Sequence, residues 1–495
     1  MGIVKRQSIK YSLVTFVGVA IGAVNMLLVY PLAFTTDHIG AFQLIIASAF
    51  VILPFISFGT SGVAIRFFSR FQNSTDNRGL LTLLLGVWVL GFLGFVGVYA
   101  IGGDSIVNST LKGGRDLSVY IDLMLPILFF TGTSKILTSY ISNYHRITFP
   151  AIFNNLLLKI AQPLLAIGYL VGLISFYAFL VGVGLAYALV SVLLFAYLHQ
   201  IQPGGLSFDR VRISPVVQRE MGSFVAYGVV GSISTILILK VDILMVGWLS
   251  TLSAAGIYSV VAIISEVLDT PRKAIESITN PIVSSHLKTD NMDELEQLYR
   301  SSSLHLILAG MGLFLLISLN IDYLFALMPD GERFVPGKWV VVVLMLGTLY
   351  DLFTSINSAI IIYSRYYRWN FYATISFAIL VVVSNYFFIG WLGLIGAAWA
   401  TVLAKVVFNT SKSIYVWMKF RIHFLSPKLG MTIGLGVLIY FAFLNIAFPL
   451  PPFWAICIQS LLIVLIYGGT VFALRISDDV NDSITAALKK IVGRA

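Results

Sequence analysis

Fourteen apolar segments, each long enough to cross a lipid bilayer, occupy most of this 495-residue chain. A membrane-spanning helix needs about 20 consecutive apolar residues. In lipid, each backbone polar group must be satisfied within the protein, so such a chain folds as a bundle of helices. Charged residues make up only 11% of the sequence, and the positive ones are dispersed between the apolar runs, which excludes a soluble or nucleic-acid-binding protein. The expected spans are 10–33, 39–65, 79–101, 119–141, 148–170, 173–198, 221–247, 253–278, 302–328, 338–363, 370–390, 393–417, 428–448 and 453–475.

Positive residues between the spans indicate how the chain is oriented. With both termini in the cytoplasm, twenty-four Lys and Arg residues lie on the cytoplasmic side and four on the outer side. This asymmetry follows the positive-inside rule and supports an even number of spans. The short basic stretch before residue 10 is interpreted as part of a retained first helix, not as a cleaved signal peptide. The single cysteine, Cys457, excludes an internal disulfide.

Short sequence matches indicate a tandem repeat. Three pairs of motifs recur at offsets of 216 to 222 residues, beginning at Gly40 and Gly256, Arg146 and Arg368, and Gly172 and Gly393. Two parallel six-helix lobes, related by a pseudo-twofold axis and followed by a helix pair, are therefore expected. The expected parts are lobes at 1–200 and 215–420, a helix pair at 425–476, and an amphipathic cytoplasmic tail at 477–495.

Four lysines lie inside the expected spans: Lys135, Lys159, Lys240 and Lys405. A charge at the bilayer centre costs about 2.5–3.5 kcal/mol on insertion scales, so it normally faces the bundle interior or a watery cavity. The first lobe has no carboxylate at a span centre. We therefore expect these lysines, with Arg66 at the cytoplasmic end of the second span, to line a cationic cavity that binds an anion. Alternatively, the lysines pair with carboxylates or snorkel, and Arg66 is a membrane anchor.

Embedded carboxylates lie in the second half of the chain: Asp242, Glu266, Asp269 and Asp351. They are candidate sites for proton or sodium coupling, and structural pairing with Lys240 or Lys405 is the alternative. Lys240 and Asp242 cannot pair with each other, because a separation of two residues places them roughly 200° apart around a helix.

Glycines and prolines mark expected places of close packing and bending. Gly18 and Gly22 form one G-x-x-x-G motif, and Gly430 and Gly434 form another; both are interpreted as close-packing surfaces. A proline inside a span, such as Pro163, removes a backbone hydrogen bond and predicts a kink.

The sequence contains no motif that indicates enzymatic chemistry. It lacks the phosphate-binding G-x-x-x-x-G-K-[ST], the metalloprotease H-E-x-x-H, the G-x-S-x-G elbow and any Cys/His metal spacing. We therefore expect no catalytic residue, metal or cofactor, and energy from an ion gradient or from the substrate's own gradient. A membrane-embedded polymerase or ligase would need a sizeable outer loop with catalytic Arg or His, and no expected outer connection exceeds about 20 residues.

Three stretches, 58–66, 241–259 and 280–299, are similar to bacterial polysaccharide flippases of O-antigen and capsule assembly. The plan of six, six and two spans without a nucleotide-binding motif also resembles their parent group, the multidrug/oligosaccharidyl-lipid/polysaccharide exporter (MOP) superfamily, which includes the MATE transporters. The resemblance implies inner-to-outer-leaflet export of an undecaprenyl-diphosphate-linked oligosaccharide in the bacterial cytoplasmic membrane, through a cavity lined by basic residues.

The resemblance also implies partners and leaves two alternatives within the superfamily. The implied partners are the lipid-linked diphosphate substrate, membrane lipid, H⁺ or Na⁺, and a polysaccharide polymerase or ligase. Cation-coupled multidrug exporters commonly carry an acidic residue in the first span, where this chain has Asn25. Lipid II flippases use clustered arginines in the first two spans, where this chain offers Arg66.

Overall fold

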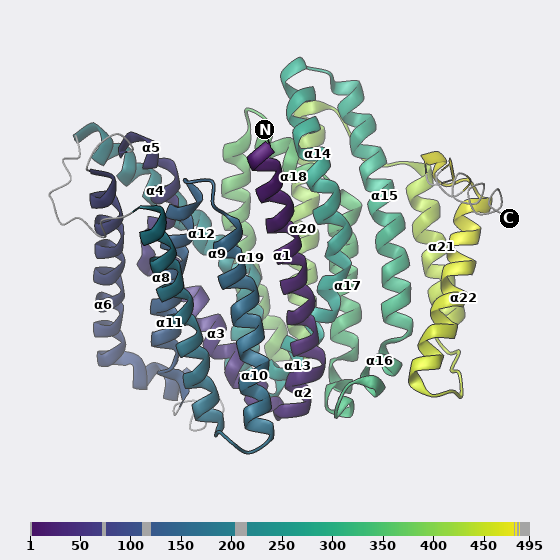
Figure 1. Cartoon of the computed structure of the whole chain (residues 1–495). Helices are drawn as coiled ribbons and strands as arrows, with labels where there is room; N and C mark the ends of the chain where they lie inside the picture. Colours follow the sequence, from purple (N-terminus) through teal and green to yellow (C-terminus); the bar gives the residue numbers. More distant parts are fainter. Residues whose placement is uncertain are drawn as a thin grey trace. The chain divides into compact units, whose positions relative to one another are not determined.

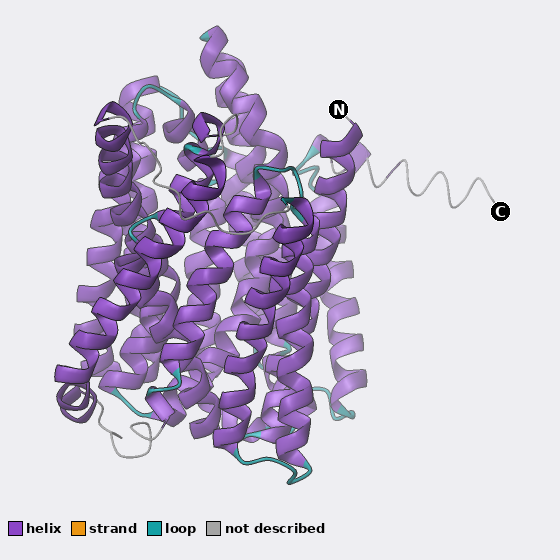
Figure 2. Ribbon diagram, turned by 60° about the vertical axis from the view of Figure 1, so that its left-hand side comes forward, coloured by secondary structure: helices purple, strands orange, loops and turns teal. Residues whose placement is uncertain are grey.

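The structure is a computed structural model that describes residues 2–71, 76–110, 120–202, 215–479, 481, 482 and 485. Within these residues every regular element is a helix (Figure 2). This confirms the predicted all-helical fold. Packing divides the chain into two compact units, Met1–Val260 and Val261–Ala495, which are described separately.

The first unit begins with a long helix that ends in a π-helical turn, and its later helices run roughly alongside one another (Figure 1). Helix α3 packs against α8 and α12, α8 packs against α11, and α10 packs against α11 and α1. The elements are α1 (Gly2–Val24), η1 (Asn25–Val29), α2 (Tyr30–Ala33), α3 (Thr36–Ser57), α4 (Thr60–Arg66), α5 (Phe68–Phe71), α6 (Asp76–Thr110), α8 (Met124–Ser142), α9 (Thr148–Ala151), η2 (Ile152–Leu157), α10 (Leu158–Leu170), α11 (Phe176–Ile201), α12 (Pro215–Leu249) and α13 (Leu252–Glu266), which crosses the unit boundary.

The second unit is built around α20, which packs between α17 and α19. Helix α15 packs against α17 and α21, and α21 lies beside α22 (Figure 1). The elements are η3 (Val267–Asp269), α14 (Thr270–Thr289), α15 (Met292–Leu319), α16 (Ile321–Leu327), η4 (Gly331–Gly337), α17 (Lys338–Thr354), α18 (Asn357–Tyr363), α19 (Tyr367–Leu392), α20 (Leu394–Phe420), α21 (Pro427–Phe443) and α22 (Pro452–Ala473).

Twelve of the fourteen expected spans contain a helix that is long and apolar enough to cross a membrane, judged on the described residues. The remaining two correspond to α8, with 19 residues, and α21, with 17 residues. The total of fourteen spans and the cytoplasmic location of both termini therefore stay predictions.

Some expected spans end earlier than predicted. The second span was expected over 39–65, but α3 ends at Ser57, because Phe58 adopts a φ of 46°, outside the helical region. The tenth span, expected over 338–363, is interrupted at Ser355, which has a φ of 50°. In contrast, α15 begins at Met292, inside the predicted cytoplasmic connection, because the Asn291 side chain accepts a hydrogen bond from the Glu294 N–H and caps it.

The starts of α3 and α13 meet at two glycines of the first unit. A Cβ on Gly40 would lie 1.9 Å from the carbonyl oxygen of Leu252, and a Cβ on Gly256 would lie 2.0 Å from that of Thr36. Both glycines therefore permit an approach that any side chain would block. The Thr36 and Ser253 hydroxyl oxygens are also hydrogen-bonded at 2.7 Å. Because Thr36 and Leu252 share the 216-residue offset of the two glycines, the contact is reciprocal, as expected near a twofold axis.

The predicted lobes and the compact units follow different criteria. The units reflect which helices pack together, and their boundary falls inside α13 at Val260. The lobes at 1–200 and 215–420 and the helix pair at 425–476 follow sequence matches, and their superposition stays a prediction. Most of the predicted tail helix at 477–495 lies outside the described residues, although Asp478 and Asp479 are helical.

Candidate functional site

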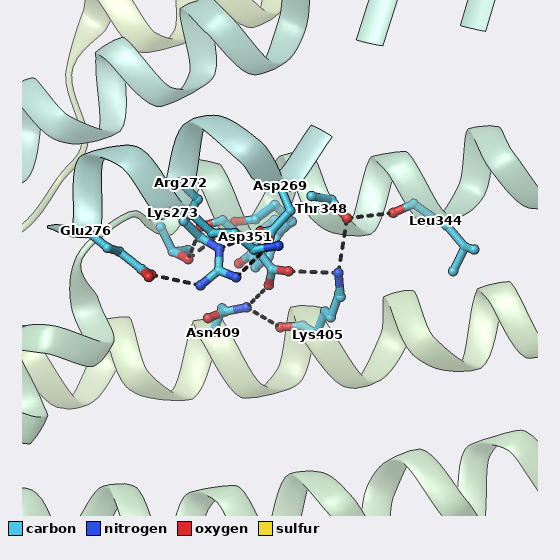
Figure 3. Close-up of polar contacts among 11 residues, drawn as sticks. Asp269, Arg272, Lys273, Glu276, Leu344, Thr348, Asp351, Lys405 and Asn409 are labelled. Atoms are coloured by element: carbon cyan, nitrogen blue, oxygen red, sulfur yellow. Dashed lines mark hydrogen bonds and ion pairs between the residues drawn. The ribbon is translucent and has the colours of Figure 1, made fainter. Parts of the chain in front are cut away.

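A network of charged side chains lies inside the second unit, where η3, α14, α17 and α20 come together (Figure 3). It begins at a break in the eighth span. Helix α13 gives way to the 3₁₀ turn η3, and α14 restarts at Thr270 with Pro271 in its first turn. Because proline lacks an N–H, it suits the first turn of a helix but not the interior of a continuous one. The break lies at Asp269, midway along the 38-residue segment Leu252–Thr289.

Arg272 is held by two carboxylates of its own segment. Its Nε lies 2.6 Å from Asp269 Oδ1 and its Nη2 lies 2.9 Å from Asp269 Oδ2, so this pair is bidentate. Its Nη1 donates to Glu276 Oε1 at 2.8 Å. Lys273 Nζ lies 3.5 Å from Asp269 Oδ2, at the exposed edge of the network. These contacts follow from spacings of three and four residues along a helix.

Asp351 of α17 is paired with Lys405 of α20. Their Oδ2 and Nζ atoms are 2.8 Å apart, and Lys405 Nζ also donates to Thr348 Oγ1 at 3.1 Å. The second carboxylate oxygen of Asp351 accepts a hydrogen bond from Asn409 Nδ2. The pair is mostly shielded, since the side chains of Lys405 and Asp351 are only 24% and 20% exposed.

Lys412 continues the same face of α20, because it lies seven residues after Lys405 and three after Asn409. It is 5% exposed. Its Nζ donates to Ser358 Oγ of α18 at 2.7 Å and lies 3.6 Å from the centre of the Phe408 ring. A lysine this deeply buried requires groups that stabilise its charge: the hydroxyl accepts a hydrogen bond, and the ring face supplies a cation–π contact.

Apart from Lys273, whose exposed side chain lies at the edge, the charges of the network balance. Its three carboxylates are matched by three partly or fully shielded cations: Asp269, Glu276 and Asp351 by Arg272, Lys405 and Lys412. Asp351 also interacts electrostatically with Arg272 and Lys412, so the two halves of the network are coupled. Binding or release of one proton or cation would therefore leave an uncompensated charge in a shielded site, which is costly.

The other predicted lysines lie in the first unit. Lys135 is exposed on α8, and Lys240 is half-buried on α12; neither forms an ion pair with the residues that the structure describes. Lys159 lies on α10, and its Nζ would be 2.9 Å from a Cβ placed on Gly22 of α1. These positions neither confirm nor contradict a substrate role.

The remaining predicted residues also have distinct surroundings. Arg66, exposed at the end of α4, places its guanidinium carbon 4.7 Å from the centre of the Phe224 ring of α12. Asp242 accepts a hydrogen bond from Tyr258 Oη at 3.1 Å. Glu266 is exposed at the end of α13.

The structure thus brings together three of the predicted site residues, Asp269, Asp351 and Lys405. Lys405 takes the ion-paired arrangement that the sequence left open as the alternative. Two members were not identified as site residues from sequence: Arg272 and Lys412 lie near the ends of the expected spans 253–278 and 393–417 and were counted with the cytoplasmic charges, but in the structure they join the network. Their spacing from Asp269 and Lys405 is the signal that could have found them.

Potential metal ligands do not gather in the part of the chain that the structure describes. No group of three His, Cys, Asp or Glu side chains is placed to hold a metal ion there.

Comparisons with known proteins place this geometry in a known fold. The profile of a family described as "Polysaccharide biosynthesis protein" matches residues 45–326. A solved structure titled "Lipid II flippase MurJ, inward closed conformation" has a TM-score of 0.71 and 12% sequence identity, with 95% of this chain and 100% of that chain covered. An inward-facing multidrug resistance MATE family transporter of the MOP superfamily has a TM-score of 0.65 and 13% identity, with 83% and 94% covered. No curated protein matches the chain significantly. The predicted MATE/MOP-like fold is thereby confirmed.

Proposed function

Because the chain belongs to the polysaccharide biosynthesis protein family, we propose that it is a flippase for an undecaprenyl-diphosphate-linked oligosaccharide. It moves this lipid from the inner to the outer leaflet of the bacterial cytoplasmic membrane. The product serves O-antigen, capsule or exopolysaccharide assembly, where a polymerase or ligase takes it up. The family match over residues 45–326, joined to a transporter fold, is the observation that carries the proposal.

The charge of the first six spans supports an anionic substrate. A diphosphate that crosses a low-dielectric layer needs nearby positive charge. Lys135 and Lys159 supply such charge from α8 and α10. Residues 1–200 contain five acidic residues, all near expected span ends: Asp37, Asp76, Asp104, Asp116 and Asp122. A cavity for cationic drugs would require the opposite sign, so this distribution disfavours a multidrug exporter.

The charged network of the second unit is the proposed site of ion coupling. The Asp351–Lys405 pair is the part of this network that joins α17 to α20. Protonation of Asp351 would remove the charge that holds Lys405 and leave the network with an excess of one positive charge. A sodium ion would compete with the Lys405 ammonium for the same carboxylate. Either event weakens the link between α17 and α20.

Lipid II flipping is a second candidate, favoured by the structural likeness to MurJ. Both substrates carry a diphosphate on a lipid, so the same lysines serve either one. Growth rescue in bacteria depleted of their own lipid II flippase would support this candidate. Restored surface polysaccharide without growth rescue would support the first.

Replacement of Lys159 tests the substrate role. In cells whose own polysaccharide flippase is deleted, Lys159→Ala should sharply reduce surface polysaccharide while the protein inserts and accumulates normally. Lys159→Arg should be tolerated better, because the charge matters more than the donor geometry. Normal polysaccharide with Lys159→Ala would rule out the role, and loss of the protein itself would indicate a structural ion pair instead.

A further inference from the structure

Helices α1 and α10 meet along a stripe of small residues. Gly18, Gly22 and Asn25 follow one another at helical spacing; Gly18 faces η2, and Gly22 and Asn25 face α10. A Cβ on Gly18 would lie 3.1 Å from the carbonyl oxygen of Asn155, and a Cβ on Gly22 would lie 2.9, 3.4 and 3.5 Å from the Nζ, Cε and Cδ atoms of Lys159. The Lys159 side chain therefore runs directly across the α1 backbone at Gly22.

The backbone of Lys159 is tied to α1 as well. In a regular helix its carbonyl would accept from the N–H four residues later, but that residue is Pro163, which has none. The Asn25 side chain supplies the missing donor: its Nδ2 lies 2.7 Å from Lys159 O. Asn25 is buried, at 3% exposed, so this bond is shielded from water. The missing N–H at Pro163 and the amide of Asn25 thus tie the backbone of Lys159 to α1.

Both helices change geometry beside this lysine. The π-helical segment η1 starts at Asn25, and η2 (Ile152–Leu157) ends two residues before Lys159. A π-helical bulge adds one residue to a turn and rotates the side chains that follow by about 100°. The direction in which Lys159 points therefore depends on η2, and π-helical bulges are frequent at functional sites.

We propose that Gly22 is a positioning residue for Lys159. Because Gly22 carries no side chain, the Lys159 ammonium can lie where an anionic lipid headgroup is bound. This inference rests on the proposed flippase function and deepens it. A side chain at Gly22 would displace the ammonium rather than the helix, since the atom it meets first is the far end of a flexible side chain. The effect should therefore appear in headgroup recognition and not in folding.

Gly18 provides the matched control. It lies one turn earlier on the same stripe, but its Cβ would meet the Asn155 backbone, which cannot move aside. Gly18→Ala should therefore lower the melting temperature and leave headgroup recognition intact, and Gly22→Ala should do the reverse.

The measurement is the binding preference of the purified full-length protein for undecaprenyl diphosphate over undecaprenol, followed by tryptophan fluorescence, with the melting temperature recorded in parallel. Gly22→Ala should reduce the preference roughly tenfold, the scale of weakening one charge-assisted hydrogen bond. Adding Gly22→Ala to Lys159→Ala should have no further effect, because Gly22 acts through the lysine.

Each outcome separates the two proposals. If the wild-type protein did not prefer undecaprenyl diphosphate over undecaprenol, or if Lys159→Ala left that preference unchanged, the substrate role of Lys159 would be overturned, and the inference with it. A reduced preference in Lys159→Ala together with a normal one in Gly22→Ala would overturn the positioning role alone. Additive losses in the double variant would show that Gly22 acts on something other than Lys159.

Discussion

In the second unit Lys405 lies against a carboxylate, whereas in the first unit Lys159 lies against a glycine. Lys405 belongs to a network in which three shielded cations face three carboxylates. Lys159 is seated on the backbone of α1, with its own carbonyl held by Asn25. The same residue type thus lies against a carboxylate in one unit and runs across the backbone of a glycine in the other.

This difference predicts different consequences of mutation. A paired cation contributes to stability through its partner, and removal of either partner leaves a shielded charge. For Lys159, the proposed substrate role predicts that removal of the charge affects the bound ligand. Variants can therefore be sorted by whether they change the amount of folded protein or its activity.

The largest effect on stability is expected for Asp351→Ala. This change leaves Lys405 without its counter-charge and Asn409 without its acceptor, at a cost of about 3 kcal/mol, the lower end for a buried pair because the site keeps some exposure. Thermal unfolding in detergent and the amount of protein in membranes measure it. The double variant Asp351→Leu with Lys405→Met should recover most of the loss. An unchanged melting temperature in Asp351→Ala would show that the Asp351–Lys405 pair does not stabilise the fold, and would contradict the difference expected between Lys405 and Lys159.

A smaller loss is expected for Lys412→Met. Methionine keeps the length and apolar contacts of the side chain, but the hydrogen bond to Ser358 disappears and the network is left with one extra negative charge. We expect a cost of about 1–2 kcal/mol, close to that of one hydrogen bond made by a charged group. Adding Glu276→Gln, which restores the balance of charges, should reduce the cost. If Glu276→Gln instead increased the loss of stability, the charges of the network would not act as a balanced set.

The smallest effect on stability is expected for Lys135→Met. Lys135 is exposed and forms no ion pair with the described residues, so the free energy of unfolding should change by no more than about 0.5 kcal/mol. Flipping of the lipid-linked oligosaccharide in proteoliposomes should nevertheless fall if Lys135 contributes charge to the substrate path. A marked drop in melting temperature would place Lys135 with the paired cations.

The fold could be predicted from sequence because the hydropathy of a segment indicates whether it lies in lipid. The G-x-x-x-G motifs show the limit of such patterns. Gly18 and Gly22 do pack closely, against η2 and α10, but no described atom of a neighbouring element lies within 4 Å of the Cβ positions of Gly430 and Gly434. The motif indicates a helix face with small side chains, whereas the tertiary fold determines whether another helix packs against that face.

The charged network could be predicted only in part, because a sequence pattern does not show which helices pack together. Lys405 and Asp351 were identified as embedded charges, but their pairing joins two residues that are 54 positions apart in sequence. Arg272 lies near the end of the expected span 253–278 and was counted with the cytoplasmic charges, because the sequence becomes polar there. In the structure the helix continues to Thr289, and the polar residues face one another inside the unit.

The reciprocal contact of Gly40 and Gly256 has an evolutionary consequence. An ancestral six-helix chain that paired with its own copy through this surface would have had to carry identical residues on both sides of the axis. In the predicted repeat, fusion of the two copies would remove that obligation everywhere except where the backbones touch. At the offset of the glycines, Asp269 corresponds to the buried Leu53, and at the offset of the sixth and twelfth spans Lys405 corresponds to Gly184. Such a repeat leaves one half free to acquire ionic chemistry that the other does not share, while both halves keep a glycine where their backbones touch.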